Sequence, residues 1–298
     1  MKTTIFGAYT DRGGTRPENQ DSVISCAIQG TSDVTEKPRL PFAMLGRTKN
    51  KEKTTQNTMQ TQVILSVVCD GVGGLERGDL ASAVVIRELD RWTGQLAECI
   101  NIDHLEPDIL FSHFKDAAEH CNAVLMETNN TYHIRSGTTF SGFLCVGGVY
   151  GIIHIGDSRV YRYRPTEGIG TKLLQLTEDE SVYRVKDGRT RSYLENFVGR
   201  LEPLSFRFYT GSMEIGDMLF ACSDGFYHNL TESDVGEMYA AISRGISPEE
   251  AIASVMHLMI ARGERDNLSA ALLIFGGCVA ENISGIAAAD TYADVTMI

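Results

Sequence analysis

The chain has 298 residues, of which 43% are hydrophobic and 22% charged, a composition typical of one globular protein with a sizeable core. Its 39 Asp and Glu residues exceed its 27 Lys and Arg residues, and the formal net charge of −12 argues against nucleic acid or an anionic membrane as the main partner. No apolar run reaches the roughly 18 residues of a membrane span. The beginning of the sequence does not resemble a signal peptide, and seven scattered cysteines without C-x-x-C spacing fit a reduced protein, so we expect a cytoplasmic location.

The first quarter of the chain predicts three strands and one long excursion. Residues 3–14 read as a strand ending in a glycine turn, and the alternation of residues 21–28 predicts a second strand. Residues 30–62 contain two prolines and many lysines and threonines without a sustained period, and we expect an inserted loop there. Residues 62–71 form a continuous apolar run that stops at Asp-Gly, which is typical of a buried strand.

The middle of the chain changes from helical to strand periodicity. Residues 78–100 and 106–130 carry apolar residues at helical spacing and predict two successive helices. Residues 138–164 alternate as strands do, with a hairpin turn at the Gly-Gly pair inside "VGGVYG". Residues 171–180 predict one more strand.

The last third of the chain is less regular at its start. Residues 181–200 are basic and aromatic without a clean pattern. Residues 205–213 and 217–225 both read as strands, and we expect them to pair with each other. Residues 267–277 predict the last strand of the body.

Two amphipathic helices precede that last strand. They are expected over residues 231–245 and 247–263, with Thr231 and Ser247 as N-caps and an acidic residue three positions after each. Strands in blocks and helices in pairs are typical of antiparallel sheets with helices packed outside them. The order of elements therefore predicts an α+β fold in a single domain.

Three predicted strands run into an aspartate that is followed by glycine or serine: Asp70, Asp224 and Asp157. Each alone is more simply an ordinary turn, but together they would converge if the strands are central. Carboxylates about 5 Å apart repel by roughly 3 kcal/mol at an effective dielectric constant near 20, so such a cluster requires a cation or a shared proton. Oxygen ligands without Cys or His nearby favour Mg²⁺ or Mn²⁺ over Zn²⁺.

Three further residues occupy similar positions. Asp266 lies in a short polar link before the last strand, and Arg16 and Asp21 come just before the second strand. A guanidinium group matches phosphate with two hydrogen bonds, and paired hard metal ions suit phosphoryl transfer. The cluster therefore predicts a site for a phosphate ester, although Arg16 considered alone would be a surface residue.

Eight short motifs follow one another along the chain. They are R-x-x-N-Q-D (Arg16 to Asp21), D-G-x-G-G (Asp70 to Gly74), G-D-x-A-S (Gly78 to Ser82), S-G-T-T (Ser136 to Thr139), G-D-S-R-x-Y-R (Gly156 to Arg162), L-T-x-D-x-S (Leu176 to Ser181), S-D-G (Ser223 to Gly225) and R-D-N (Arg265 to Asn267). In this order they resemble the metal-dependent protein serine/threonine phosphatases of the type 2C (PPM) family in their bacterial form. The resemblance extends from about residue 4 to residue 276, so we expect a catalytic domain at residues 1–276 and a C-terminal tail at residues 277–298.

The resemblance implies a four-layer α-β-β-α sandwich, in which two packed antiparallel sheets are flanked by helix pairs. It also implies a site for two Mn²⁺ or Mg²⁺ ions. Asp70 would bridge the ions, the carbonyl of Gly71 would bind the first, and Asp224 and Asp266 would bind the second. Asp157 matches the position that, with Asp224, supports a third and weaker ion in bacterial members.

The catalytic roles implied by the resemblance fall on Arg16 and Asp21. Arg16 would hold the phosphate, and Asp21 would orient a metal-bound water without binding an ion itself. A hydroxide bridging the ions would attack phosphorus in line, with no covalent phosphoenzyme. Some family members carry a histidine after Asp-Gly that acts as general acid, whereas this chain has Val72.

The segment at residues 178–200 corresponds to the flap of the family. It is rich in basic residues against the acidic balance of the chain: Arg184, Lys186, Arg189 and Arg191. We expect them to bind phosphopeptide substrates, the alternative being a solvated loop. The expected partners are phosphorylated proteins and a cognate serine/threonine kinase, and the protein is expected to be a monomer.

Two rival functions remain open at this stage. The chain could be a catalytically weak, phosphatase-like regulator that binds phosphoproteins, although its intact metal-ligand aspartates argue against that. It could also hydrolyse small phosphoesters or nucleotides, although the sequence shows no pocket for a base.

Overall fold

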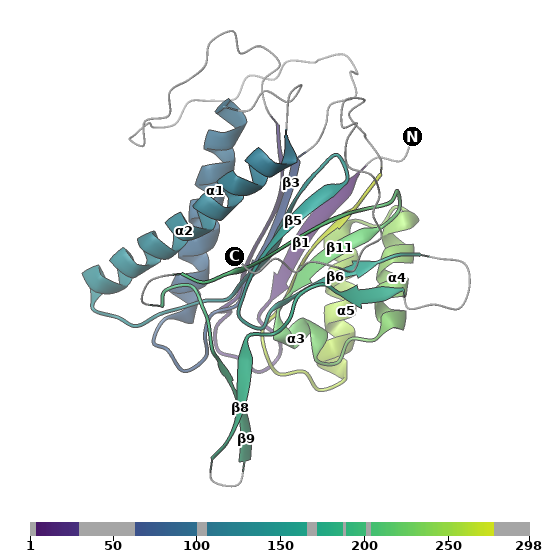
Figure 1. The fold of residues 1–298 in the computed structure, drawn as a ribbon. Helices are drawn as coiled ribbons and strands as arrows, with labels where there is room; N and C mark the ends of the chain where they lie inside the picture. The colour runs from purple at the N-terminus through teal and green to yellow at the C-terminus, as the bar shows by residue number, and fades with distance from the viewer. Residues whose placement is uncertain are drawn as a thin grey trace.

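Two five-stranded antiparallel sheets are packed face to face at the centre of the computed structural model (Figure 1). The structure describes residues 4–29, 63–99, 106–165, 172–186, 189–200 and 204–276. In the first sheet the strands are, in spatial order, β1 (Ile5–Asp11), β12 (Leu268–Ile274), β11 (Met218–Cys222), β6 (Arg159–Tyr163) and β7 (Leu173–Gln175). In the second sheet they are β10 (Arg207–Ser212), β5 (Val149–Ile155), β4 (Phe140–Val146), β3 (Val63–Cys69) and β2 (Ser22–Ile28).

A pair of helices covers the outer face of each sheet (Figure 1). Helices α1 (Gly78–Cys99) and α2 (Pro107–Tyr132) share a hydrophobic core with the second sheet. Helices α4 (Glu232–Ser243) and α5 (Pro248–Ala261) share another with the first sheet, and the short helix α3 (Asp224–Tyr227) follows β11. The α+β class and the four-layer order expected from the sequence are confirmed.

A third core fills the space between the sheets, and it explains the continuous apolar run of β3. Every residue of β3 is buried. Leu65 and Val67 point toward α1 and α2, whereas Ile64 and Val68 belong to the core between the sheets. Because a strand alternates its side chains between two faces, a strand that is covered on both faces has no position for a polar residue except where a partner is available.

The predicted N-caps of the last two long helices are confirmed. The side chain of Thr231 accepts a hydrogen bond from the backbone of Asp234, and the side chain of Asp234 accepts from the backbone of Thr231, which together form a capping box. Ser247 caps α5 by accepting from the backbone of Glu250. The Gly147-Gly148 turn between β4 and β5 has positive φ at both positions, 56° and 86°, as a tight hairpin turn requires.

The expectation that the strands labelled β10 and β11 pair with each other is wrong. β10 pairs with β5 in the second sheet, and β11 lies between β12 and β6 in the first. The chain crosses between the sheets just after β10. Met213 still donates its backbone N–H to Gly148, next to β5 of the second sheet, whereas the carbonyl of Asp217 accepts from the N–H of Phe275, next to β12 of the first sheet. Burial separates the two strands, since β10 is a half-exposed edge strand and β11 is fully buried.

Residues 181–200, which show no clean pattern in the sequence, contain a two-stranded hairpin. Its strands are β8 (Ser181–Lys186) and β9 (Arg189–Leu194), and it projects from the body of the molecule (Figure 1). A two-stranded hairpin has little core of its own, and its described side chains at Arg184 and Tyr193 are exposed, which fits the lack of a hydrophobic alternation. The expected loop at residues 30–62 and the expected tail at residues 277–298 lie outside the described residues. In the described part of the chain, no helix is long and apolar enough to cross a membrane.

Candidate metal centre

Antiparallel pairing brings the expected site residues of the second sheet together at one end of its strands. Asp21 immediately precedes β2, Asp70 immediately follows β3, and Asp157 follows β5. The register places the start of β2 beside the end of β3, and the start of β4 beside the end of β5. Since β3 and β4 are antiparallel neighbours, all four of these strand ends lie together.

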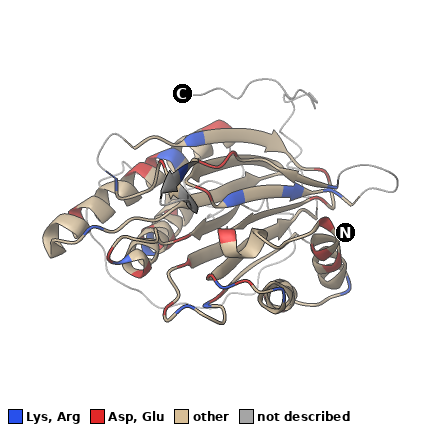
Figure 2. Cartoon of the chain, turned by 90° about the horizontal axis from the view of Figure 1, so that it is seen from below, with Lys and Arg blue, Asp and Glu red and all other residues tan. Residues whose placement is uncertain are grey.

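The first sheet contributes the remaining residues at the same end of the molecule. Asp224 begins α3 after β11, Asp266 precedes β12, and Arg16 lies in the loop that follows β1. The end of β11 pairs with the starts of β12 and β6, and the start of β12 pairs with the end of β1. Asp157 lies in the connection from β5 of the second sheet to β6 of the first, so it lies where the strand ends of the two sheets meet. Figure 2 views the molecule from this end, with the helix pairs on opposite sides of the sheets.

The S-G-T-T motif fastens the Asp70 loop. The backbone N–H of Asp70 donates to Thr139 Oγ1 at 2.9 Å, and the Asp70 carbonyl accepts from the N–H of Thr139 and from Thr138 Oγ1, both at 2.8 Å. Thr139 Oγ1 also lies 2.8 Å from Ser158 Oγ. The turns that carry Asp70 and Asp157 are therefore linked through one buried threonine and one buried serine.

The glycine after two of the aspartates permits close packing of loops. A Cβ atom on Gly71 would lie 2.6 Å from the backbone of Gly78, and one on Gly225 would lie 2.2 Å from the carbonyl oxygen of Asn267 and 3.1 Å from Asp266 Cβ. A side chain at either position would force the loops apart. Glycine at position 225 thus lets the segment that carries Asp266 approach the start of α3.

Asn267 is a site-supporting residue whose role the sequence interpretation missed. Its side chain is buried and donates to the carbonyls of Arg12 and Glu18 at 2.8 and 3.0 Å, while it accepts from the backbone N–H of Gln20 at 3.0 Å. It therefore fixes both ends of the loop that carries Arg16. The R-D-N motif contained this residue, but nothing in the sequence said which backbone groups it would bind.

The carboxylates at this end of the molecule raise one another's pKa. Burial is the largest cause at Asp70, whose pKa lies well above its usual range, followed by the charges of Asp21 and Asp224. Burial is also the main cause at Asp224, whose pKa is raised, and at Asp21 and Asp157, whose pKa values are raised to about 7. Asp70 and Asp224 keep some accessible surface, but the protein packed around them removes much of the water that would stabilise their charge.

Arg16 is the one cation paired directly with this cluster among the described residues. Its Nη2 lies 2.5 Å from Asp266 Oδ2, and both side chains are partly exposed, at 48% and 32%. This hydrogen bond is the main reason that the pKa of Arg16 is raised. The structure thus brings Arg16 to the cluster, but as a partner of an expected metal ligand.

The donors present fit a hard divalent ion. They are oxygen atoms, the kind of ligand that Mg²⁺ and Mn²⁺ prefer. Asp21 is only 6% exposed, and its Oδ2 has no hydrogen-bond partner within the described residues, which is costly for a buried carboxylate unless a water or cation faces it. However, no three His, Cys, Asp or Glu side chains in the described part of the chain are arranged to hold an ion as they stand. Binding would therefore require the carboxylates to close around the ion.

The four basic residues expected to bind substrate lie elsewhere, on the projecting hairpin. The register of β8 and β9 pairs Arg184 with Arg191 and Lys186 with Arg189. Arg184 is exposed, and its guanidinium lies 6.0 Å from the ring centroid of Tyr193. Figure 1 shows the hairpin and α3 at the same end of the molecule.

Known proteins resemble this chain in sequence and in fold, although no protein-family model matches it. Protein phosphatase PhpP of Streptococcus pneumoniae serotype 2 is 22% identical over 241 residues, which make up 76% of this chain and 92% of PhpP. The structure of the S. agalactiae serine/threonine phosphatase has a TM-score of 0.65 and 19% identity, and covers 92% of this chain and 100% of its own. The catalytic domain of the serine/threonine phosphatase PstP, solved with two manganese ions, has a TM-score of 0.61 and 21% identity, and covers 91% and 97%.

Proposed function

We infer that the chain is a protein serine/threonine phosphatase of type 2C, which hydrolyses phosphoserine and phosphothreonine in proteins at a dinuclear Mn²⁺ or Mg²⁺ site. The resemblance to protein phosphatases is confirmed by curated relatives, and the fold by solved structures. The observation that carries the proposal is the convergence of five aspartates from five separate loops, with Arg16 on the loop of Asp21, at one end of the paired sheets.

The proposed ligand set follows the order of the motifs. Asp70 would lie between two ions, with the carbonyl of Gly71 on the first and Asp224 and Asp266 on the second. When bound, the ions would supply a deprotonated water as nucleophile and would offset negative charge on the phosphoryl oxygens. The two manganese ions in PstP support a dinuclear site. A third, weaker ion at Asp157 and Asp224 belongs to the proposal as well.

The side chains of the protein would bind and orient the phosphate and move its protons. Arg16, which is partly exposed, would exchange Asp266 for two phosphoryl oxygens, because a guanidinium group matches phosphate with parallel hydrogen bonds. Asp21, a buried carboxylate whose Oδ2 has no hydrogen-bond partner among the described residues, would orient the attacking water and accept its proton. Val72 has no proton to donate, so the leaving group would take its proton from solvent.

The same inference extends to partners and location. Phosphorylated proteins would be the substrates, and a serine/threonine kinase would produce them. We propose a monomer in the cytoplasm, with residues 1–276 as the catalytic domain.

The proposal is tested by Mn²⁺-dependent hydrolysis of a phosphothreonine peptide. We expect Asp70→Asn to lower kcat/KM by at least about 100-fold, because it removes the carboxylate proposed to lie between the ions. The matched control is Asp108→Asn, an exposed aspartate in the first turn of α2, which should retain wild-type turnover.

Two results would contradict the proposal. Wild-type protein that binds the phosphopeptide but does not hydrolyse it would indicate a regulatory protein. A kcat/KM for nucleotides or other small phosphoesters above that for the peptide would indicate a small-molecule phosphoesterase.

A further inference from the structure

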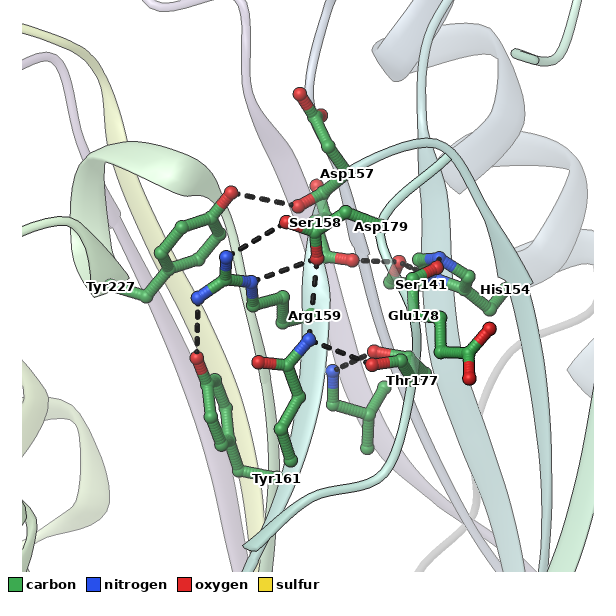
Figure 3. A network of polar contacts seen from close by, with 12 residues as sticks. Ser141, His154, Asp157, Ser158, Arg159, Tyr161, Thr177, Glu178, Asp179 and Tyr227 are labelled. Atoms are coloured by element: carbon green, nitrogen blue, oxygen red, sulfur yellow. Dashed lines mark hydrogen bonds and ion pairs between the residues drawn. The ribbon is translucent and has the colours of Figure 1, made fainter. Parts of the chain in front are cut away.

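The guanidinium group of Arg159 holds three neighbours at once (Figure 3). Its Nε and Nη2 donate to the two carboxylate oxygens of Asp179 at 2.9 and 2.8 Å, and its Nη1 donates to the hydroxyl of Tyr161 at 3.0 Å. Its planar face lies over the ring of Tyr227, 3.7 Å from the centroid. A bidentate, partly buried ion pair that is also stacked on an aromatic ring has one well-defined geometry.

Tyr227 connects this arginine to the aspartates. Tyr227 is the last residue of α3, whose first residue is Asp224, and its hydroxyl donates to the backbone carbonyl of Asp157 at 3.0 Å (Figure 3). One hydroxyl group therefore fixes the Asp157 turn to the helix that begins at Asp224.

Asp179 connects the same arginine to the base of the hairpin. Asp179 lies two residues before β8, and the segment around it is held to the Asp157 turn on both sides. Glu180 donates its backbone N–H to the Gly156 carbonyl at 2.7 Å, and Thr177 Oγ1 accepts from the N–H of Val160 at 3.0 Å. The hairpin base, the Asp157 turn and α3 thus share one set of contacts.

We propose that Arg159 and Tyr227 are positioning residues that fix Asp157 relative to Asp224 for a divalent cation, and that they link this spacing to the base of the β8–β9 hairpin. This inference rests on the proposed metal site. Neither residue would touch substrate or ion. Tyr227 would act through the carbonyl of Asp157, and Arg159 through the ring of Tyr227 and the carboxylate of Asp179.

The test is calorimetric titration of metal-free, full-length protein with Mn²⁺. Tyr227→Phe keeps the ring under Arg159 and removes only the hydroxyl, and we expect it to weaken the weakest Mn²⁺ binding step by about 3- to 10-fold, the size of one lost hydrogen bond. Arg159→Lys, which keeps the charge but loses the bidentate and stacked geometry, should weaken that step more. In turnover of an aryl phosphate, excess Mn²⁺ should restore the kcat of Tyr227→Phe to the wild-type value.

The matched control is Tyr163→Phe. Tyr163 is buried on β6 and packs against Tyr239 of α4 instead of α3, so its substitution should leave Mn²⁺ binding unchanged. The inference is overturned if Tyr227→Phe binds Mn²⁺ as the wild type does, if Tyr163→Phe weakens binding equally, or if excess Mn²⁺ fails to restore kcat. Wild-type protein that binds no Mn²⁺ would overturn the proposed metal site itself, and this inference with it.

Discussion

Asp21 shows how a single buried charge couples the fold to pH. Its carboxylate is 6% exposed, and burial raises its pKa from 3.8 to about 7, with the Asp224 charge acting in the same direction and the hydroxyls of Ser269 and Ser223 opposing it. Between these two pH values the folded state binds more protons than the unfolded state. The free energy of unfolding must therefore fall as the pH rises through this range. Below the unfolded pKa of 3.8, Asp21 is protonated in both states and does not destabilise the fold.

This sign gives a measurable prediction for Asp21→Asn. In protein treated with a chelator, we expect ionisation of Asp21 alone to lower the free energy of unfolding by about 2–4 kcal/mol between pH 4.5 and 7.5, since one unit of pKa corresponds to about 1.4 kcal/mol. Asp21→Asn cannot ionise, so its decline should be smaller, whereas Asp108→Asn should behave as the wild type. Urea unfolding at several pH values measures this. Equal pH dependence in Asp21→Asn and wild type would contradict it.

At the scale of elements, Asp234 joins the two helices that cover the first sheet. Its side chain accepts from the backbone N–H of Thr231 at 2.9 Å and from Arg262, at the end of α5, at 2.6 and 2.8 Å. The hydrogen bonds from Arg262 are the main reason that the pKa of Asp234 is lowered to about 2. A capping carboxylate that also binds the neighbouring helix stabilises both.

We expect Asp234→Asn to lower the free energy of unfolding by about 1–2 kcal/mol at pH 7, a figure reduced because Arg262 is partly exposed to solvent. The stabilisation by the carboxylate is fully present above its unfolded pKa of 3.8 and is lost as the pH falls through about 2. The difference between variant and wild type should therefore shrink at acidic pH. Thermal unfolding at pH 7 and pH 2.5 measures it, with the exposed Asp116→Asn as control. A difference that stays constant with pH would show that packing, not charge, is lost.

The sequence predicts those helices, strands and site residues that depend on nearby residues in the chain, but not those that depend on contacts between distant segments. The long helices and the strands buried on both faces follow from local periodicity, and the caps at Thr231 and Ser247 follow from residue spacing. The partners of β10 and β11 do not, because strand pairing is decided by tertiary packing. The same holds in the site: a pattern marks Asp70, but the binding of Asn267 to a loop about 250 residues away leaves no local trace.

At the scale of the whole molecule, the two sheets form a rigid base and the hairpin stands apart from it. The strand ends that carry the aspartates are connected to one another by hydrogen bonds in which threonine, serine and asparagine side chains take part. The hairpin β8–β9 is a separate two-stranded sheet that contacts the body at its base. If the proposed function holds, this arrangement would separate the chemistry, which requires fixed geometry, from substrate recognition on a projecting element.

Substitution of the basic residues of the hairpin would test whether substrate recognition is separate from the chemistry. Like charges on paired strands disfavour the pairing, and the register sets Arg184 opposite Arg191 and Lys186 opposite Arg189, so a bound anion would stabilise the hairpin. If that anion is a phosphopeptide, changing all four to alanine should lower kcat/KM for an acidic phosphopeptide by about 5- to 50-fold, since each exposed ion pair contributes roughly 0.2–1 kcal/mol. Turnover of p-nitrophenyl phosphate, which has no peptide chain for the hairpin to bind, should stay at the wild-type value. The loss of kcat/KM for the phosphopeptide should also be smaller at high salt, because exposed charges are screened.

An equal loss of turnover with the phosphopeptide and with p-nitrophenyl phosphate would contradict this prediction. It would show that the hairpin supports the site itself and does not select the substrate.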